Sequence, residues 1–261
     1  MITLDKFIAT GKSHFICQDY ILSGPDYVIL SDGCSGCANT DIGARILCLS
    51  AADVLETWRE TINSLQWFDL GQKVITQAKI MANSLFLNDE CLAATLMIIF
   101  NDFANNTLHI FVYGDGYVFL EHSDHILSFR EISFIDGKLN NKPFYLAYYL
   151  TPQAYQMYEE QGIVQRLSGP STHSDHKFDH PIHWTYTMDD FKTIVIASDG
   201  IDTFDHKPST IDIARECVKF KTTSGYFLQR RMIRAIKNFG KKKIYHQDDI
   251  TIGGFHREDE E

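Results

Sequence analysis

The sequence predicts an α+β fold in which helices pack on antiparallel sheets. Its apolar segments occur in the order strands, two helices, strands, an irregular stretch, a strand, two helices and a strand. Successive strands are joined by short turns, whereas a parallel sheet needs a crossover helix between its strands. No repeat of fixed period is visible. Layered α+β packing therefore fits the chain better than alternating βαβ units.

The first elements precede residue 90. A Ser-Gly-Pro turn separates two apolar runs, which predicts strands at residues 14–22 and 26–31. Apolar residues then recur at helical spacing over residues 40–55 and 71–87, which predicts two helices. Asp41 supplies the acid that is favoured in the first turn of a helix.

Short apolar runs follow, separated by turn residues. They predict four strands, at residues 93–100, 108–113, 117–121 and 126–129. The pattern weakens between residues 136 and 190, where the histidine-rich segment 173–183 is expected to be a mobile polar insertion beside the site. The last elements predicted are a strand at 191–197, helices at 211–219 and 224–238, and a strand at 249–255.

The composition is that of a globular protein. The 261 residues are 44% hydrophobic and 22% charged, and they predict one domain over residues 1–256 with an acidic, disordered tail at 257–261. A formal net charge of −10 disfavours nucleic acid as a partner. No apolar run approaches the roughly 18 residues of a membrane helix, and the N-terminus lacks the order of a signal peptide. We expect a cytoplasmic protein without a membrane partner, and the sequence does not set its oligomeric state.

Basic runs and cysteines offer little chemistry. Lys241 to Lys243 is expected to be a solvated helix end. Cys34 and Cys37 have C-x-x-C spacing, but a zinc site would need a second such pair, and no redox motif surrounds them. Three other cysteines lie in apolar contexts and are expected in the core: Cys48, Cys91 and Cys217.

Acidic residues stand where several apolar runs end. Buried strands that deliver carboxylates to one place indicate a site for hard cations. Mg²⁺ or Mn²⁺ in such a site would point to phosphate chemistry. Three runs end in Asp-Gly, and two more end in other acids: Asp32-Gly33, Asp115-Gly116, Asp199-Gly200, Asp19 and Asp248-Asp249.

The alternative for an Asp-Gly pair is a hairpin turn, in which both residues accept positive φ. That alternative stays open for Asp115, because an apolar run follows it at once. It fails for Asp32 and Asp199, because no strand follows either of them directly. A tight turn explains one of the adjacent acids Asp248 and Asp249, and their mutual repulsion favours a ligand role for Asp248.

Other catalytic templates fail. Gly11-Lys12-Ser13 lacks the rest of a phosphate-binding loop, and neither G-x-S-x-G nor H-E-x-x-H occurs. Covalent catalysis by serine therefore has no support in the sequence.

The acidic motifs resemble those of the metal-dependent protein serine/threonine phosphatases of the PPM, or PP2C, family, in a divergent bacterial form. The resemblance extends from about residue 14 to residue 255. Each motif alone is weak, but five in order at near-family spacing are fairly specific. The matches are Gln18-Asp19 for an early acidic pair, Asp32-Gly33-Cys34-Ser35-Gly36 for D-G-x-x-G, Gly114-Asp115-Gly116 for G-D-S, Ser198-Asp199-Gly200-Ile201 for S-D-G-L, and Asp248-Asp249-Ile250-Thr251-Ile252 for D-[DN]-I-T-V.

The resemblance implies a four-layer α-β-β-α sandwich with two central antiparallel β-sheets. It also implies two Mn²⁺ or Mg²⁺ ions in a cleft at one end of the sandwich. Asp32 would bridge both ions and the Gly33 carbonyl would ligate one of them. Asp199 and Asp248 would hold the other ion.

Two further acids receive weaker roles from the resemblance. Asp19 would act mainly through water held by the ions. Asp115, together with Asp199, would belong to a weaker third metal position seen in bacterial members. The expected catalytic set is therefore Asp19, Asp32, Asp199 and Asp248.

The chain departs from the family pattern at three positions. Gln18 replaces the usual Glu, which removes one negative charge near the ions. His14 stands near the place of the usual phosphate-binding Arg, with Lys12 close by, so these two residues are expected to meet the substrate phosphate. Cys34 stands where many eukaryotic members have a proton-donating His.

Three functions remain open from the sequence. The first is a phosphatase that hydrolyses phosphoserine and phosphothreonine in proteins. The second is a catalytically weak relative that acts as a phospho-dependent regulatory or binding module, which Gln18 and the missing Arg suggest. The third is a hydrolase of small phosphorylated metabolites.

Overall fold

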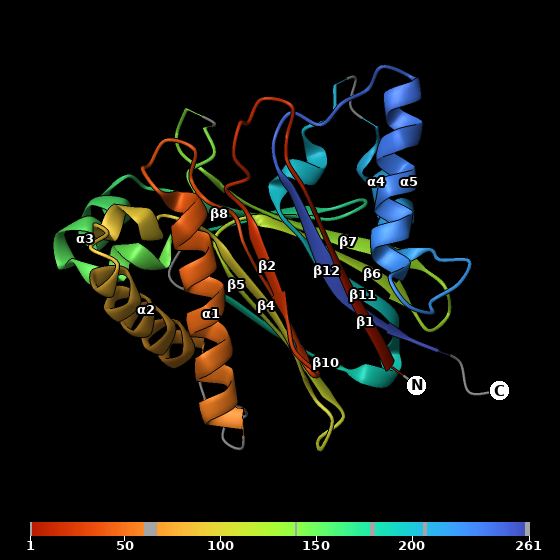
Figure 1. Ribbon diagram of the computed structural model, residues 1–261, viewed down its shortest axis with the longest axis horizontal. Helices are drawn as coiled ribbons and strands as arrows, with labels where there is room; N and C mark the ends of the chain where they lie inside the picture. The colour runs from red at the N-terminus through yellow and green to blue at the C-terminus, as the bar shows by residue number, and fades with distance from the viewer. Residues whose placement is uncertain (1, 60–66, 139, 178–180, 206–207, 259–261) are drawn as a thin grey trace.

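Two antiparallel sheets stack face to face, and helices cover the outer face of each (Figure 1). This computed structural model describes residues 2–59, 67–138, 140–177, 181–205 and 208–258. The arrangement confirms the predicted α+β class and the four-layer sandwich.

The smaller sheet has the strand order β10-β5-β4-β3-β2. Its central strands are continuous apolar runs because both of their faces are covered. Val28, Ile29 and Leu30 of β3 are all fully buried. The five strands are β2 (Tyr20–Ser23), β3 (Tyr27–Ser31), β4 (Leu96–Asp102), β5 (Thr107–Tyr113) and β10 (Ile182–Thr187).

The larger sheet has the order β1-β12-β11-β6-β7-β8-β9. Every neighbouring pair in it is antiparallel. Its seven strands are β1 (Ile2–Ala9), β6 (Gly116–His122), β7 (Leu127–Ile135), β8 (Val164–Ser168), β9 (His173–Lys177), β11 (Phe191–Ala197) and β12 (Ile250–Arg257).

Two helix pairs form the outer layers (Figure 1). Helices α1 (Thr40–Trp58) and α2 (Trp67–Ser84) lie on the five-stranded sheet, and α4 (Thr210–Val218) and α5 (Phe227–Lys241) lie on the seven-stranded sheet. One buried apolar cluster fills the space between the sheets and beneath α1 and α2. A second cluster lies beneath α4 and α5. None of the helices in the described ranges is both long and apolar enough to cross a bilayer.

The N-terminal part of the chain differs from the prediction in two ways. Strand β1 was not predicted, and the predicted strand at residues 14–22 is wrong over residues 14–19, because β2 begins only at Tyr20. The preceding loop bonds to another segment instead of a sheet. The Asp249 carboxylate accepts the N–H groups of Gly11 and Gln18, both at 2.7 Å.

The weakly patterned region 136–190 is more regular than predicted. It contains the 3₁₀-helix η3 (Leu146–Leu150), helix α3 (Pro152–Glu160), β8, β9 and β10. All five residues of β9 in the histidine-rich segment are exposed. Residues 178–180 of this segment lie outside the described residues.

The predicted disordered tail also begins too early. Arg257 is the last residue of β12, and Thr223 Oγ1 donates a hydrogen bond to Glu258 at 3.0 Å. Both residues therefore belong to the folded part. Residues 259–261 lie outside the described ranges.

Candidate active site

Five aspartates meet at one end of the sandwich, each delivered by the end of a strand. Asp32 follows β3, Asp115 separates β5 from β6, and Asp199 follows β11. Asp19 precedes β2, and Asp248 lies just before β12. The charges of the other four all act on Asp32, which places it at the centre of the cluster.

Burial makes four of these carboxyl groups, those of Asp19, Asp32, Asp115 and Asp199, reluctant to ionise. It raises the pKa of Asp32 well above the ordinary value, and the charges of Asp19 and Asp199 raise it further. Burial also raises the pKa of Asp19 to about 7 and that of Asp115 to about 8. No lysine or arginine in the described ranges is among the leading influences on these groups or on Asp199. A bound cation would remove this electrostatic cost.

Asp32 is held in place by its neighbour on β4. The N–H of Thr95 donates to the Asp32 carbonyl at 2.8 Å, and Thr95 Oγ1 accepts the Asp32 N–H at 3.1 Å. Gly33 continues this pairing through a bridge to Ala94. A Cβ atom on Gly33 would lie 2.7 Å from the carbonyl oxygen of Gln18, so this close packing requires glycine.

The ends of β11 and β12 are tied together beside Asp199 and Asp248. The Ser198 hydroxyl accepts the N–H of Thr251 at 3.0 Å and donates to the carbonyl of Asp249 at 3.3 Å. These bonds fix the two strand ends that carry the acids.

Asp115 lies in the tight connection between β5 and β6, and its carboxyl group is also buried in the acidic cluster. The flanking glycines have positive φ, +112° at Gly114 and +138° at Gly116. Asn141 Nδ2 donates to Asp115 Oδ2 at 2.5 Å and so orients the carboxyl group. Both alternatives that the sequence left open for Asp115, a turn and a site residue, are compatible with this geometry.

His14 lies next to the two acids before β12. Its Nδ1 is 3.5 Å from Asp248 Oδ1 and 3.0 Å from Asp249 Oδ2, close enough for the three groups to hold one cation. Burial opposes protonation of His14, but the close contact with the charge of Asp249, helped by Asp248, raises its pKa above the ordinary value. The imidazole is therefore favoured as a cation at the rim of the site.

The three departures from the family pattern have distinct surroundings. Gln18 Nε2 donates to Thr40 Oγ1 at 3.0 Å, so the amide is used in packing the loop against α1. Cys34 is half-buried beside Gly33, and its N–H donates to Ala93. The Lys12 ammonium lies 4.6 Å above the ring of Tyr245 and is exposed.

A cleft of about 390 Å³ opens beside the cluster. Asp115 and Asp199 line it, together with Asp202 and Arg166. Arg166 pairs with Asp175 through two contacts of 2.7 Å. Neither Asp202 nor Arg166 was predicted as a site residue. Asp202 could have been recognised, because it lies only three residues after Asp199 in the sequence. Arg166 could not, because it reaches the cleft only through the pairing of β7 with β8.

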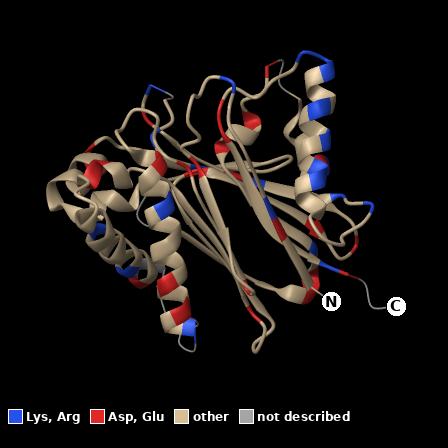
Figure 2. Ribbon diagram, in the orientation of Figure 1, with Lys and Arg blue, Asp and Glu red and all other residues tan. Residues whose placement is uncertain are grey.

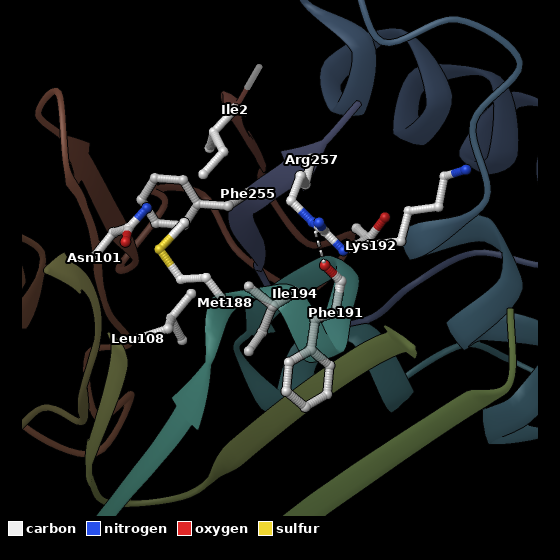
Figure 3. Close-up of a pocket in the computed structure, with 10 residues that line it drawn as sticks. Ile2, Asn101, Leu108, Met188, Phe191, Lys192, Ile194, Phe255 and Arg257 are labelled. Carbon is white, nitrogen blue, oxygen red and sulfur yellow. Dashed lines mark hydrogen bonds between the residues drawn. The ribbon is translucent and has the colours of Figure 1, made fainter. Parts of the chain in front are cut away.

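A second pocket lies at the opposite end of the strands and has a different character (Figure 3). Apolar side chains such as Ile2, Leu108 and Phe255 line it, and Asn101 and Thr193 are buried polar residues of its wall. Its volume of about 20 Å³ has room for roughly one water molecule. It is therefore too small for a phosphorylated substrate.

The donor set at the acidic end fits hard divalent cations. Apart from the His14 imidazole beside Asp248 and Asp249, its candidate ligands are oxygens, which Mg²⁺ and Mn²⁺ prefer. Within the described residues, Asp19 Oδ2 is buried and has no hydrogen-bond partner. Three cysteines are buried in the core, as expected, and are not among the candidate metal ligands: Cys48, Cys91 and Cys217.

Comparisons with known proteins identify the family and agree with the fold. The family model described as protein phosphatase 2C matches residues 10–236. No curated protein matches the chain by sequence. Solved structures share the fold over nearly the whole chain at low identity. A bacterial serine phosphatase is 14% identical with a TM-score of 0.61, and the match covers 100% of both chains.

Two further structures are similar. Stp1 from Staphylococcus aureus is 16% identical with a TM-score of 0.59, and the match covers 99% of this chain and 96% of that one. The catalytic domain of PstP in complex with two manganese ions is 13% identical with a TM-score of 0.55, over 98% and 97% of the chains. The family model covers most of the sequence, and so the chain belongs to the protein phosphatase 2C family.

Proposed function

We propose that this chain is a metal-dependent phosphatase that hydrolyses phosphoserine and phosphothreonine in proteins. The observation that carries the proposal is the convergence of four buried aspartates, Asp19, Asp32, Asp115 and Asp199, with the partly exposed Asp248 in a member of this family. The family relative PstP, whose structure contains two manganese ions, supports the same chemistry.

The proposed cofactors are two Mn²⁺ or Mg²⁺ ions. Asp32 and the Gly33 carbonyl would hold one ion, and Asp32, Asp199 and Asp248 the other. Asp115 with Asp199 would offer a third position. When bound, such ions acidify water and neutralise phosphate charge.

The chain's own residues would position the reaction. Asp19 lies buried against Asp32 and would accept a proton within the cluster. His14 carries positive charge at the rim, and Lys12 is exposed beside it, so both would attract the substrate phosphate. Asp249 holds the backbone of the loop that carries these two residues.

The direct test is hydrolysis of p-nitrophenyl phosphate with and without Mn²⁺. Asp199→Asn should abolish Mn²⁺-dependent turnover while the thermal unfolding profile stays cooperative. The control Asp53→Asn removes an exposed acid from α1 and should behave as wild type. Full activity in Asp199→Asn would exclude this residue from the mechanism.

One observation favours the catalytically weak regulatory module as a second candidate. The Gln18 amide is bonded to Thr40, and His14 is paired with Asp249, so neither side chain is free in the way a ligand or phosphate-binding group would be. Tight phosphopeptide binding without phosphate release in Mn²⁺ would favour this module. A panel of phosphorylated metabolites run beside the phosphopeptides tests the third function.

A further inference from the structure

Helix α5 presents a stripe of positive charge to solvent. Arg230, Arg234, Lys237 and Lys241 are all exposed, and their spacing of four, three and four residues places them along one side of the helix. Figure 2 shows lysine and arginine along the length of this helix. We call these four residues the α5 stripe.

The α5 stripe lacks acidic partners in the described part of the chain. Helix α5 contains no Asp or Glu. Arg230 donates to Thr222 Oγ1 and to the carbonyl of Ser224, which are both neutral. The ion pair on this face, from Arg231 to Glu216, involves a residue outside the stripe. In a chain with a net charge of −10, such an unpaired row of cations is a local exception.

The α5 stripe leads to the rim of the candidate active site. Lys241 ends the helix, and the exposed Lys242 and Lys243 follow. The chain then reaches Tyr245, whose ring lies 4.6 Å from the Lys12 ammonium. The N–H of Lys12 donates to the carbonyl of His246, two residues before Asp248. Positive groups therefore continue from the helix to the acidic cluster.

We propose that the α5 stripe docks an acidic segment of the phosphoprotein substrate, beside the phosphorylated residue. This inference rests on the proposed function. Fifteen helical residues span roughly 22 Å, which an extended peptide covers with about seven residues. The preferred substrates then carry several Asp or Glu residues in a stretch of about seven residues, on one side of the phosphorylated residue.

The positive charge of the α5 stripe is complementary to an acidic substrate segment. Most of this acidic protein repels an acidic substrate, so a local row of cations selects both the partner and its direction of approach. Exposed ion pairs are individually weak, and the selectivity therefore requires several of them acting together. The preference should fall as salt rises from 50 to 300 mM.

The test compares phosphothreonine peptides with an acidic or a neutral flank, together with p-nitrophenyl phosphate. The variant Arg234→Glu/Lys237→Glu should lower kcat/KM for the acidic peptide by about 10-fold or more and leave the neutral peptide and p-nitrophenyl phosphate unchanged. The control Lys73→Glu/Lys79→Glu makes the same change in net charge on α2, in the opposite outer layer, and should retain the preference. Arg234→Gln/Lys237→Gln replaces the reversal variant if that one unfolds.

Three outcomes would overturn the docking surface. The wild type could show no acidic preference, the stripe variant could keep it, or the α2 control could lose it equally. Binding of anionic phosphatidylserine vesicles that depends on the stripe, with no peptide preference, would assign the surface to membranes instead.

Fluorescence anisotropy with the labelled peptides separates this proposal from the proposed function. Stripe-dependent binding of the acidic peptide without hydrolysis would uphold docking and reject the phosphatase assignment. Hydrolysis of p-nitrophenyl phosphate without stripe-dependent binding would uphold the phosphatase assignment and reject docking.

Discussion

Gly200 and Asp249 are in direct backbone contact. A Cβ atom on Gly200 would lie 1.7 Å from the carbonyl oxygen of Asp249, a distance that no side chain can occupy. The contact joins the turn after β11 to the residue before β12. It therefore sets the separation of Asp199 from Asp248, the two acids on either side of it.

Gly200→Ala should move these two acids apart. We expect loss of Mn²⁺-dependent hydrolysis of p-nitrophenyl phosphate by about 100-fold, because a displacement of about 1 Å at a catalytic site has an effect of this size. The control is Gly137→Ala, where an added Cβ would meet nothing within 4 Å. Equal activity in the two variants would show that the contact does not position the site.

Asp32→Asn should stabilise the metal-free protein while abolishing activity. The folded-state pKa of Asp32 is raised, so its ionisation works against folding as pH rises above the ordinary value of about 4. The melting temperature of the variant in EDTA should exceed that of wild type by several degrees, at about 2–4 °C per kcal/mol, and the gap should widen toward high pH. Mn²⁺ should raise the wild-type melting temperature more than the variant's. A variant that is less stable than wild type at pH 9 in EDTA would contradict the repulsion.

Asn141→Ala should weaken the proposed third metal position. The Asn141 amide bonds to the Asp115 carboxyl at 2.5 Å, and removing such an orienting group typically costs about 10-fold in metal affinity. We expect a higher Mn²⁺ concentration for half-maximal hydrolysis, measured by Mn²⁺ titration. Asn140→Ala removes an exposed neighbouring amide and serves as the control. Identical titrations would show that Asn141 does not tune the site.

The pair His109 and His183 should make stability sensitive to acid. Their rings lie with Nδ1 of His109 3.1 Å from Nε2 of His183. Burial, together with the charge of His109, lowers the pKa of His183 to about 4. The unfolded chain then binds more protons than the folded one between pH 6.5 and 4, so stability falls as pH falls through that range.

Melting temperatures from pH 7 to pH 4.5 test this relationship. His183→Gln should reduce the acid-induced loss by several degrees relative to wild type, since its amide does not titrate. His176→Gln changes an exposed histidine of β9 and should follow the wild-type curve. A parallel loss in His183→Gln would assign the acid sensitivity to other groups.

Much of the sandwich could be predicted because its inner strands are covered on both faces. Such strands form continuous apolar runs, as β3, β4 and β11 do. Strand β1 could not be recognised because Asp5 and Lys6 interrupt its apolar pattern. Asp5 is nevertheless buried, since its carboxylate accepts the N–H of Gln229 near the start of α5 at 3.0 Å. That partner is 224 residues away, so no local pattern contains it.

The region 136–190 was hard to predict for a related reason. Strand β9 is wholly exposed, and its order depends on backbone pairing with β8. Helix α3 packs Tyr155 and Tyr158 edge-on against Phe144, at the edge of the main apolar cluster. Contacts of this kind depend on the tertiary position of the segment, and they cannot be read from helical or strand periodicity in the sequence.

The acidic residues of the site could be predicted because they lie at strand ends. The different structural role of each acid could not be predicted. Asp248 and Asp249 are adjacent in sequence, yet Asp249 is fully buried and bonds to the loop at residues 11–18, whereas the side chain of Asp248 is 40% exposed. The position of the loop at residues 11–18 determines that Asp249 anchors the backbone and that Asp248 is left as the proposed ligand.

The pairing of β1 with β12 places Ile2 opposite Arg257, so the first and last strands of the fold are neighbours. The start of β11 and the end of β12 lie at the far end of the sheet from Asp199 and Asp248. A short linker could therefore join these strands into a circularly permuted chain with new termini in an exposed turn. Fusion partners attached near either strand would likewise project away from the acidic cleft and leave it open.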